Sequence, residues 1–345
     1  MAQTARTPST VSPHGDTVPV MNAIVHTRYG TDPSQVLKLA TVSRPAPADD
    51  EVLIRVHAAS VDRGTWHIMA GVPYPIRLAG FGLRAPKHLN PGRSLAGTVA
   101  AVGRAVSTFT PGDEVFGTCD GSFADYVCAT PAKLALKPPG VSFSEAAAVP
   151  ISGVTALQAV RDHGRVHTGQ HVLVIGASGG VGGFAVQIAK AYGATVTGVG
   201  SSAKLVHVTA LGADHVIDYT TTDFASGEQR YDVILDIGGN RTLPHLRSAL
   251  TARGVLVLVG GETDERWLGG MGRTVRALML SPFLGQQLGS FIASENAEDL
   301  EVLAGMLQTG QVKPSIDRTY PLAEVGAAIT HLADGAARGK TVVTF

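Results

Sequence analysis

The stretch that decides the fold is HVLVIGASGGVGGFAVQIAK, from His171 to Lys190. An apolar run ends in glycines and is followed by apolar residues at helical spacing as far as Gly193. The glycine spacing is Gly176-x-x-Gly179-x-x-Gly182, which departs from the usual GxGxxG. Glycines between a strand and a helix let backbone N–H groups approach a pyrophosphate at the helix N-terminus. A tight strand-to-helix turn without a ligand is the alternative interpretation.

The chain around this stretch alternates strands and helices. Apolar runs such as ATVTGVG, HVIDY, YDVILDIGG and GVLVLVGG are separated by helical patterns. Near-continuous Val, Ile and Leu in the strands predict a parallel sheet that is covered on both faces. Successive strand–helix units of this kind favour the ligand-binding interpretation of the glycines. We therefore predict a dinucleotide-binding domain over residues 151–275.

The remainder of the chain has a different pattern. Residues 21–150 contain short strands separated by Pro and Gly, which predict a small barrel-like β domain. Residues 276–345 are expected to fold back onto that domain. Residues 1–20 are rich in Thr, Ser and Pro and lack the apolar core of a signal peptide, so we predict a flexible tail.

The composition excludes several classes of protein. Apolar residues make up 44% of the 345 residues and charged residues 16%, which is typical of an ordered globular protein. Lys plus Arg equals Asp plus Glu at 28 each, so the chain shows no nucleic-acid footprint. Two cysteines do not form a disulfide framework, and no segment offers an apolar membrane span. A cytoplasmic protein with no membrane partner is predicted.

The end of the second strand indicates which dinucleotide binds. NAD sites usually place an acidic residue about 20 residues beyond the glycines, where it bonds the ribose 2′-hydroxyl. No acid occurs between Gly193 and Asp214. Ser201, Ser202 and Lys204 instead supply hydroxyls and a cation, which suit a 2′-phosphate. NADPH is therefore the predicted cofactor; a solvated Lys204 that opens a helix is the alternative.

These motifs, together with PGDEVFG, AAAVPISGVTALQAV and GKTVVTF, resemble the medium-chain dehydrogenase/reductase superfamily, in particular its zinc-free quinone oxidoreductase branch. The resemblance covers residues 21–345. It implies an α/β protein with a GroES-like β-barrel catalytic domain (21–150 and 276–345), a Rossmann domain with a doubly wound parallel sheet, a cleft between them, and a homodimer. The stretch from Met279 to Phe291 is expected to be a wall of the cleft or part of a dimer contact.

The resemblance also implies roles for individual residues. Thr155 would reach the nicotinamide-side phosphate or ribose, Tyr219 would lie by the adenine ribose phosphate, and Gly260 would lie beside the nicotinamide. The pyrophosphate turn would be formed by Ser178, Gly179, Gly180 and Val181.

A catalytic zinc is not expected. Relatives that carry one hold it with Cys, His and acidic ligands. The corresponding positions here are Arg93 and Ser94, the vicinity of Ser152 and Gly153, and the cysteine-free segment AASVDRGTWH. We therefore predict no metal site.

The candidate catalytic residues lie in SVDRGTWHIMAGVPYP. Tyr74 resembles the proton-donating tyrosine of a GxYP segment, although Pro73 is inserted here; packing in a turn is its alternative role. Asp62 would contact substrate or cofactor, or cap a helix. His67 would be an acid/base or a structural histidine, and with Trp66 would line the cleft.

The leading hypothesis is an NADPH-dependent enzyme that reduces a small-molecule quinone or the C=C bond of an α,β-unsaturated carbonyl without a metal. A ketone or aldehyde reductase is the second hypothesis. A non-catalytic NADPH-binding structural or sensor protein is the third.

Overall fold

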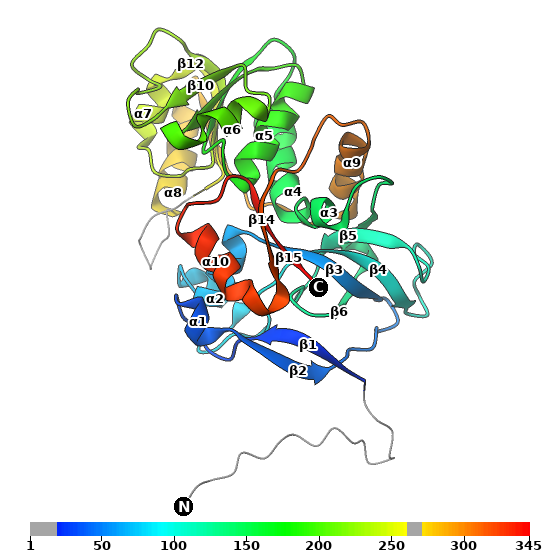
Figure 1. Cartoon of the computed structure of the whole chain (residues 1–345). Coiled ribbons are helices and arrows are strands. Elements are labelled where there is room, and N and C mark those ends of the chain that lie inside the picture. The colour runs from blue at the N-terminus through cyan, green and yellow to red at the C-terminus, as the bar shows by residue number, and fades with distance from the viewer. Residues whose placement is uncertain (1–18, 261–270) are drawn as a thin grey trace, which may run out of the picture.

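A computed structural model of the protein describes residues 19–260 and 271–345. Most of the predicted N-terminal tail, residues 1–18, lies outside the described residues. The described residues form two domains, each built on its own sheet (Figure 1). No helix in these two ranges is both long and apolar enough to cross a membrane.

The first domain is β-rich, as the spacing of its short strands predicts. Its seven-stranded sheet has the order β14-β15-β3-β4-β5-β7, with β6 paired to β3. The strands are β3 (Val52–Val61), β4 (Ser94–Val102), β5 (Glu114–Thr118), β6 (Tyr126–Ala129), β7 (Leu134–Leu136), β14 (Ile316–Pro321) and β15 (Lys340–Thr344). An antiparallel ribbon of β1 (Val20–Val25) and β2 (Lys38–Ser43) lies beside it. The helices are α1 (Pro33–Val36), α2 (Arg63–Ala70), α3 (Phe143–Ala147) and α10 (Val325–Ala333).

The second domain contains the predicted parallel sheet. Its six strands have the order β10-β9-β8-β11-β12-β13, and each neighbouring pair is parallel. They are β8 (His171–Ile175), β9 (Thr195–Gly200), β10 (His215–Asp218), β11 (Tyr231–Asp236), β12 (Leu250–Leu258) and β13 (Gln287–Ser290). The helices are α5 (Gly180–Ala191), α6 (Leu205–Ala210), α7 (Leu243–Ser248) and α8 (Met271–Leu280). The α/β class with a β-rich domain and a doubly wound sheet is confirmed.

The strand order reverses between β8 and β11, in the middle of the sheet. In open parallel sheets the carboxyl ends of the strands at such a switch point are where ligands bind. The glycine turn leaves the carboxyl end of β8 here and leads into α5. Because β13 hydrogen-bonds to β12, this domain extends to Ser290, beyond the predicted boundary at residue 275.

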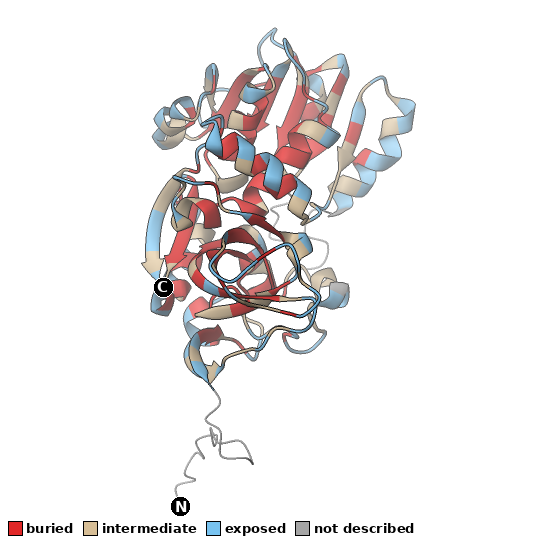
Figure 2. Ribbon diagram, turned by 90° about the vertical axis from the view of Figure 1, so that its right-hand side faces the viewer, coloured by how far each residue is buried: buried red, intermediate tan, exposed pale blue. Residues whose placement is uncertain are grey.

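Two further helices join the domains. α4 (Pro150–Gln158) packs against α5, and α9 (Ala297–Gln308) packs against both α4 and β7. One buried cluster contains Ala58 and Phe116 of the first sheet together with Val172 and Leu235 of the second. Buried residues are therefore continuous from one domain into the other (Figure 2). This shared apolar core fixes the two domains side by side.

Candidate active site

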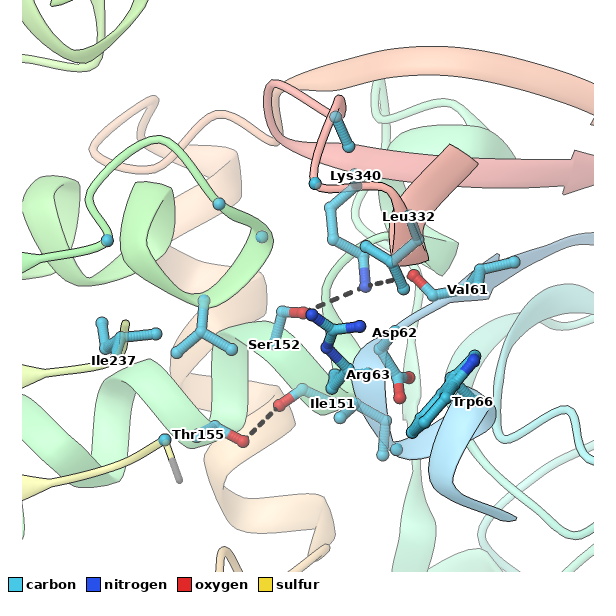
Figure 3. A pocket seen from close by; sticks show the side chains of 18 of the residues that line it. Val61, Asp62, Arg63, Trp66, Ile151, Ser152, Thr155, Ile237, Leu332 and Lys340 are labelled. Carbon is cyan, nitrogen blue, oxygen red and sulfur yellow. Dashed lines mark hydrogen bonds between the residues drawn. The ribbon is translucent and has the colours of Figure 1, made fainter. Parts of the chain in front are cut away.

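A cleft of about 860 Å³ lies between the two domains. One wall is the first turn of α2, and the other is the glycine turn with the carboxyl ends of β11 and β12. The start of α4 forms the floor, and residues of the segment 332–340 complete the cleft (Figure 3). Most of the residues predicted to bind a cofactor line it: Thr155, Ser178, Gly179, Gly180, Val181, Lys204 and Gly260.

The glycine turn has the shape of a phosphate cradle. Gly176 has a φ of +85°, a backbone conformation that residues with a side chain rarely adopt. A Cβ on Gly182 would lie 2.1 Å from the carbonyl oxygen of Gly176, so only glycine fits there. The first N–H groups of α5, which begins at Gly180, have no intrahelical acceptor and carry the positive end of the helix dipole. These residues fit the diphosphate of a dinucleotide.

Lys340 reaches the same turn from the last strand, and sequence reasoning missed it. Its buried Nζ donates to the carbonyl of Val61 at 3.2 Å and to Oγ of Ser152 at 3.0 Å (Figure 3). A Cβ on Gly180 would lie 2.9 Å from its Cδ, so the lysine packs against the turn. Burial lowers the pKa of the ammonium, and the charge of Asp62 opposes that shift. A third N–H of the ammonium remains for an anion.

Asp62 is the N-cap of α2, which is the structural alternative considered from the sequence. Its Oδ1 accepts a hydrogen bond from the backbone N–H of Thr65 at 3.0 Å, in a reciprocal capping box. Its Oδ2 is buried and has no hydrogen-bond partner among the described residues. Asp62 also lines the cleft, so the carboxylate caps the helix and faces the cations of the site at once.

One end of the cleft contains Lys204, which the sequence analysis assigns to the adenosine end of the cofactor. Its Nζ donates to the carbonyls of Gly335 and Ala337 at 2.7 and 2.9 Å, so it links the Rossmann domain to the catalytic domain. Lys204 is therefore more than a solvated helix-opening charge. Burial, and secondarily the charge of Arg338, lower its pKa.

The opposite end of the cleft is formed by the loops after β11 and β12. A Cβ on Gly260 would lie 2.1 Å from the carbonyl oxygen of Ile237, so the two loops touch. Arg273 of α8 pairs with the fully buried Asp236 at 2.7 Å and donates to the Gly260 carbonyl at 2.9 Å. Burial raises the pKa of Asp236, against the opposing effect of the Arg273 charge. This ion pair holds both loops in place beside the cleft.

Thr155 projects from α4 into the cleft. Its Oγ1 donates to the carbonyl of Ile151 at 2.7 Å, which leaves its oxygen lone pairs to accept a hydrogen bond from a ligand hydroxyl.

Comparison with known proteins identifies the family. An alcohol dehydrogenase GroES-like domain matches residues 48–157, and a family described as zinc-binding dehydrogenase matches residues 211–343. A chloroplast envelope quinone oxidoreductase homolog of Arabidopsis thaliana is 30% identical, covering 94% of this chain and 98% of that protein. The chain belongs to the medium-chain dehydrogenase/reductase superfamily. Within the superfamily it falls in the quinone oxidoreductase-like branch, which confirms the predicted family.

Two further relatives support the same branch. The 2-methylene-furan-3-one reductase of Solanum lycopersicum is 32% identical, covering 94% of this chain and 79% of that protein. The structure of the quinone oxidoreductase from Coxiella burnetii has a TM-score of 0.81 and 28% identity, covering 95% of this chain and 100% of that one. The GroES-like and Rossmann domains expected of the superfamily are confirmed.

The zinc-ligand positions of this superfamily do not fit a metal here. Arg93 is a cation, and its guanidinium donates to both carboxylate oxygens of Glu295 at 2.8 Å and pairs with Asp120. Ser94 is buried at the start of β4. Among the residues that the structure describes, no three His, Cys, Asp or Glu side chains are grouped to hold a metal ion.

The candidate catalytic side chains of this medium-chain oxidoreductase are not all brought together. His67 lines the cleft, and its Nδ1 donates to the Val72 carbonyl at 2.8 Å, which places the lone pair of a neutral ring on Nε2. The rings of Trp66 and His67 meet edge-on at 5.2 Å. Arg63, which the sequence analysis did not single out, also lines the cleft, with its guanidinium 5.9 Å from the Trp66 ring.

Tyr74 is not among the described residues that line the cleft. Its ring packs 4.9 Å from the guanidinium of Arg77, which also stacks on Tyr29 and donates to the Gly71 carbonyl. Tyr74 therefore packs in the turn beside Arg77, and its neighbour Pro73 lines the cleft.

Three predicted adenosine-end residues, Ser201, Ser202 and Tyr219, are also not among the described lining residues. The Ser202 hydroxyl donates instead to the carboxylate of Asp218, at the end of the neighbouring strand. Hydrogen bonds from Ser202 and Thr220 lower the pKa of Asp218. An acidic residue therefore does lie near the end of β9, although it comes from β10 and not from β9 itself.

Proposed function

We propose that the protein is an NADPH-dependent reductase that reduces a quinone, or the C=C bond of an α,β-unsaturated carbonyl, without a metal. The observation that carries the proposal is the cleft, in which a glycine cradle and a buried lysine face the wall formed by Trp66 and His67. The nicotinamide, when bound, supplies a hydride. The residues of this chain hold the cofactor and the acceptor and exclude water.

The charges of the cleft support a dinucleotide. Arg63, Lys204 and Lys340 are cations that line it, and Asp62 is the carboxylate that faces them. Such an excess of positive charge complements a diphosphate and an additional phosphate. Lys204 favours NADPH, whereas Asp218 beside Ser202 favours NADH as the second candidate cofactor.

The acceptor is assigned from chemistry and from relatives. The donor set at Arg93 and Ser94 does not fit a zinc ion, so a simple ketone lacks the Lewis acid that polarises it in related dehydrogenases. A quinone or enone needs less stabilisation by the protein, because the negative charge that develops on hydride addition is delocalised over the acceptor. The names of the Arabidopsis and tomato relatives point to these two substrate classes. His67 is the residue we assign to proton delivery, since it lines the cleft and imidazole is the side chain whose ordinary pKa suits acid–base work at neutral pH.

We also propose a homodimer formed through the edge of the Rossmann sheet. Strand β13 pairs with β12 on one side and ends the sheet on the other. Phe283 and Ile292, just outside the two ends of this strand, are highly exposed apolar side chains. An edge strand with neighbouring exposed apolar groups is a surface that a second copy can cover. A cytoplasmic location stays a prediction.

A turnover assay tests the function. Purified protein is mixed with NADPH or NADH and, in parallel, a quinone, an enone and a ketone, and loss of the reduced nicotinamide is followed by absorbance. We expect turnover of the quinone or enone with NADPH in preference to NADH. Turnover of the ketone alone would point to the ketone reductase, and binding without any turnover would point to a non-catalytic NADPH-binding protein.

Two matched variants separate the candidate proton donors. His67→Gln should lower kcat, while Tyr74→Phe should leave kcat within about twofold of wild type because its ring packs on Arg77 outside the cleft. A large loss of kcat in Tyr74→Phe would return the role to the tyrosine.

A further inference from the structure

A short loop of the catalytic domain, residues 77–89, exposes three leucines to solvent. Leu78, Leu83 and Leu89 have 74%, 65% and 52% of their surface accessible. Single apolar side chains on a protein surface are ordinary, but three on one short loop indicate a surface that another molecule covers. Residues 77–89 are called the leucine loop below.

Hydrogen bonds at its base hold the leucine loop in one conformation. The backbone N–H of Lys87 donates to the carbonyl oxygen of Phe81 at 2.8 Å, which closes the loop on itself. The hydroxyl of Tyr29 bonds the carbonyl oxygens of Phe81 and Gly82, both at 2.7 Å. Gly82 has a φ of +105°, which permits the sharp turn that leads to Leu83 at the tip. The exposed leucines are therefore presented by a fixed turn and not by a loose strand of chain.

The charge on the leucine loop is positive. Residues 63–112 contain no acidic residue, whereas a run of this length would contain about four at the average of the whole chain, 28 in 345. Arg84 and Lys87 are exposed on the loop itself, beside the leucines. The loop is thus apolar and cationic at the same time.

One acidic side chain from elsewhere in the chain faces the leucine loop. A carboxylate oxygen of Asp120 lies 3.8 Å from Nδ1 of His88. Asp120 also pairs with Arg93, which compensates its negative charge. It therefore leaves the positive charge of Arg84 and Lys87 to act on a partner.

The leucine loop continues directly from one wall of the cleft. Val72 and Pro73 line the cleft, and Nε of Arg77 donates to the carbonyl oxygen of Gly71 at 2.8 Å, so the start of the loop is tied to this wall. Thr31 also lines the cleft, two residues after the tyrosine that bonds the loop. A surface that binds the leucine loop therefore lies beside the cleft.

We propose that the leucine loop docks on a membrane surface that contains anionic lipid. A membrane interface combines apolar acyl chains with anionic headgroups, so it complements three exposed leucines flanked by Arg84 and Lys87. We thereby depart from the prediction of no membrane partner, because net charge and apolar spans describe the whole chain and not a local patch.

Docking would also determine the class of acceptor. This step rests on the proposed function and adds a substrate class to it: a quinone dissolved in lipid, which enters the cleft past Val72 and Pro73. Hydride from NADPH and one proton convert such a quinone to its hydroquinone, which returns to the membrane.

Sedimentation of the full-length protein with lipid vesicles tests the docking. Wild type should bind vesicles of phosphatidylcholine mixed equally with phosphatidylglycerol, and should bind phosphatidylcholine alone much more weakly. Added salt should weaken the binding, since exposed charges are screened. The double variant Arg84→Gln/Lys87→Gln and the single variant Leu83→Ser should each weaken binding to the anionic vesicles at least about tenfold.

Matched controls lie outside the leucine loop. Lys38→Gln/Arg253→Gln removes the same two charges from exposed positions on β2 and β12, and Leu136→Ser removes an exposed leucine from β7. Both controls should bind the anionic vesicles as wild type does. Thermal unfolding of each variant verifies that the exposed substitutions leave the fold intact.

Turnover measurements separate the docking from the chemistry. Leu83, Arg84 and Lys87 are not among the described residues that line the cleft, so their variants should reduce a short, water-soluble quinone within about twofold of the wild-type rate. Reduction of a long-chain quinone held in anionic vesicles should fall in parallel with vesicle binding.

The outcomes distinguish this inference from the proposed function. Wild type that does not sediment with the anionic vesicles, or loop variants that bind them as the controls do, would overturn the docking while turnover of the soluble quinone upholds the function. A dimer that Leu83→Ser dissociates, without any vesicle binding, would assign the loop to a contact between copies and also overturn the docking. Vesicle binding without turnover of any quinone would overturn the lipid-quinone substrate and leave the membrane surface in place.

Discussion

Lys340→Met is the substitution that most directly probes the cleft. It replaces a buried ammonium with an apolar side chain of similar length, next to a turn built for a diphosphate. A hydrogen bond from a charged group contributes about 1.5–3 kcal/mol. Its loss therefore weakens cofactor binding roughly tenfold to more than a hundredfold. Because NADPH and NADH share the diphosphate, both should lose the same factor.

The pH dependence of binding gives the same prediction a second readout. Burial lowers the pKa of Lys340 below its ordinary value of 10.5, and only the protonated form donates all of its N–H groups to an anion. Cofactor affinity of wild type should therefore fall as the pH rises through the lowered pKa. Lys340→Met has no such group, so its affinity should lack that decline.

Stability should respond in the opposite direction to binding. A buried amine with a lowered pKa destabilises the folded state fully at pH values below that pKa, and the effect disappears as the pH approaches 10.5. Lys340→Met removes this penalty but also two hydrogen bonds that contribute about 1 kcal/mol each. We expect the free energy of unfolding of the variant to lie within about 2 kcal/mol of wild type at neutral pH. As the pH rises, wild type should gain stability relative to the variant, because its buried amine loses the charge that burial penalises.

Calorimetric titration of NADPH and NADH over a series of pH values, together with chemical denaturation, measures both effects. Lys38→Met is the matched control, since Lys38 is exposed on strand β2 in the ribbon beside the first sheet. NADPH affinity within twofold of wild type in Lys340→Met would show that the lysine does not face the diphosphate and would refute the reasoning.

Three further substitutions test other parts of the site. Gly182→Ala forces a Cβ against a carbonyl oxygen of the turn. It should lower the free energy of unfolding by about 1–3 kcal/mol in chemical denaturation and weaken cofactor binding more than tenfold. Unchanged binding would contradict the role of the glycine turn in holding the diphosphate. Asp62→Asn keeps the helix cap, so stability should change by less than about 0.5 kcal/mol. Because the variant loses the charge that opposes the burial shift of Lys340, its cofactor affinity should decline at lower pH than that of wild type, and an unchanged profile would exclude that coupling. Glu295→Gln weakens a partly exposed ion pair with Arg93, so Tm should fall by a few degrees, and an unaltered Tm would mean that the pair contributes nothing.

The Rossmann half was predictable because its strands are buried on both faces. Strands β8 and β11 are runs of Val, Ile and Leu, and such runs read as parallel strands without any tertiary information. Strand β13 was not predictable in the same way. Its sequence QLGS is four residues long with two polar side chains and a glycine, and only the pairing with β12 makes it a strand. The predicted domain boundary at residue 275 therefore fell short of the end of the sheet.

In the candidate site, too, the features set by local sequence were predictable and those set by the fold were not. The glycine turn was predictable, because the local sequence from Gly176 to Gly182 fixes its backbone. Asp218 was not recognised as part of the adenosine end, because the distance from the glycines was counted along the chain. In the sheet, Asp218 pairs with Gly200 at the end of the adjacent strand, so an acid from β10 reaches a position that β9 leaves without one. The argument for NADPH thus depends on the cations and no longer on a missing acid.

Lys340 was missed for a related reason, and its position explains how cofactor binding and domain contact are connected. A lysine that opens an otherwise buried strand was visible in GKTVVTF, but only the fold brings it to Ser152 and the glycine turn, far away in the sequence. The same short segment bonds Ser178 through Gly339 and receives the bonds of Lys204. Any widening of the cleft at this end must break these contacts between the domains. A dinucleotide that bonds both the turn and the segment adds contacts to this junction, so its binding stabilises the interface that the apolar core already fixes.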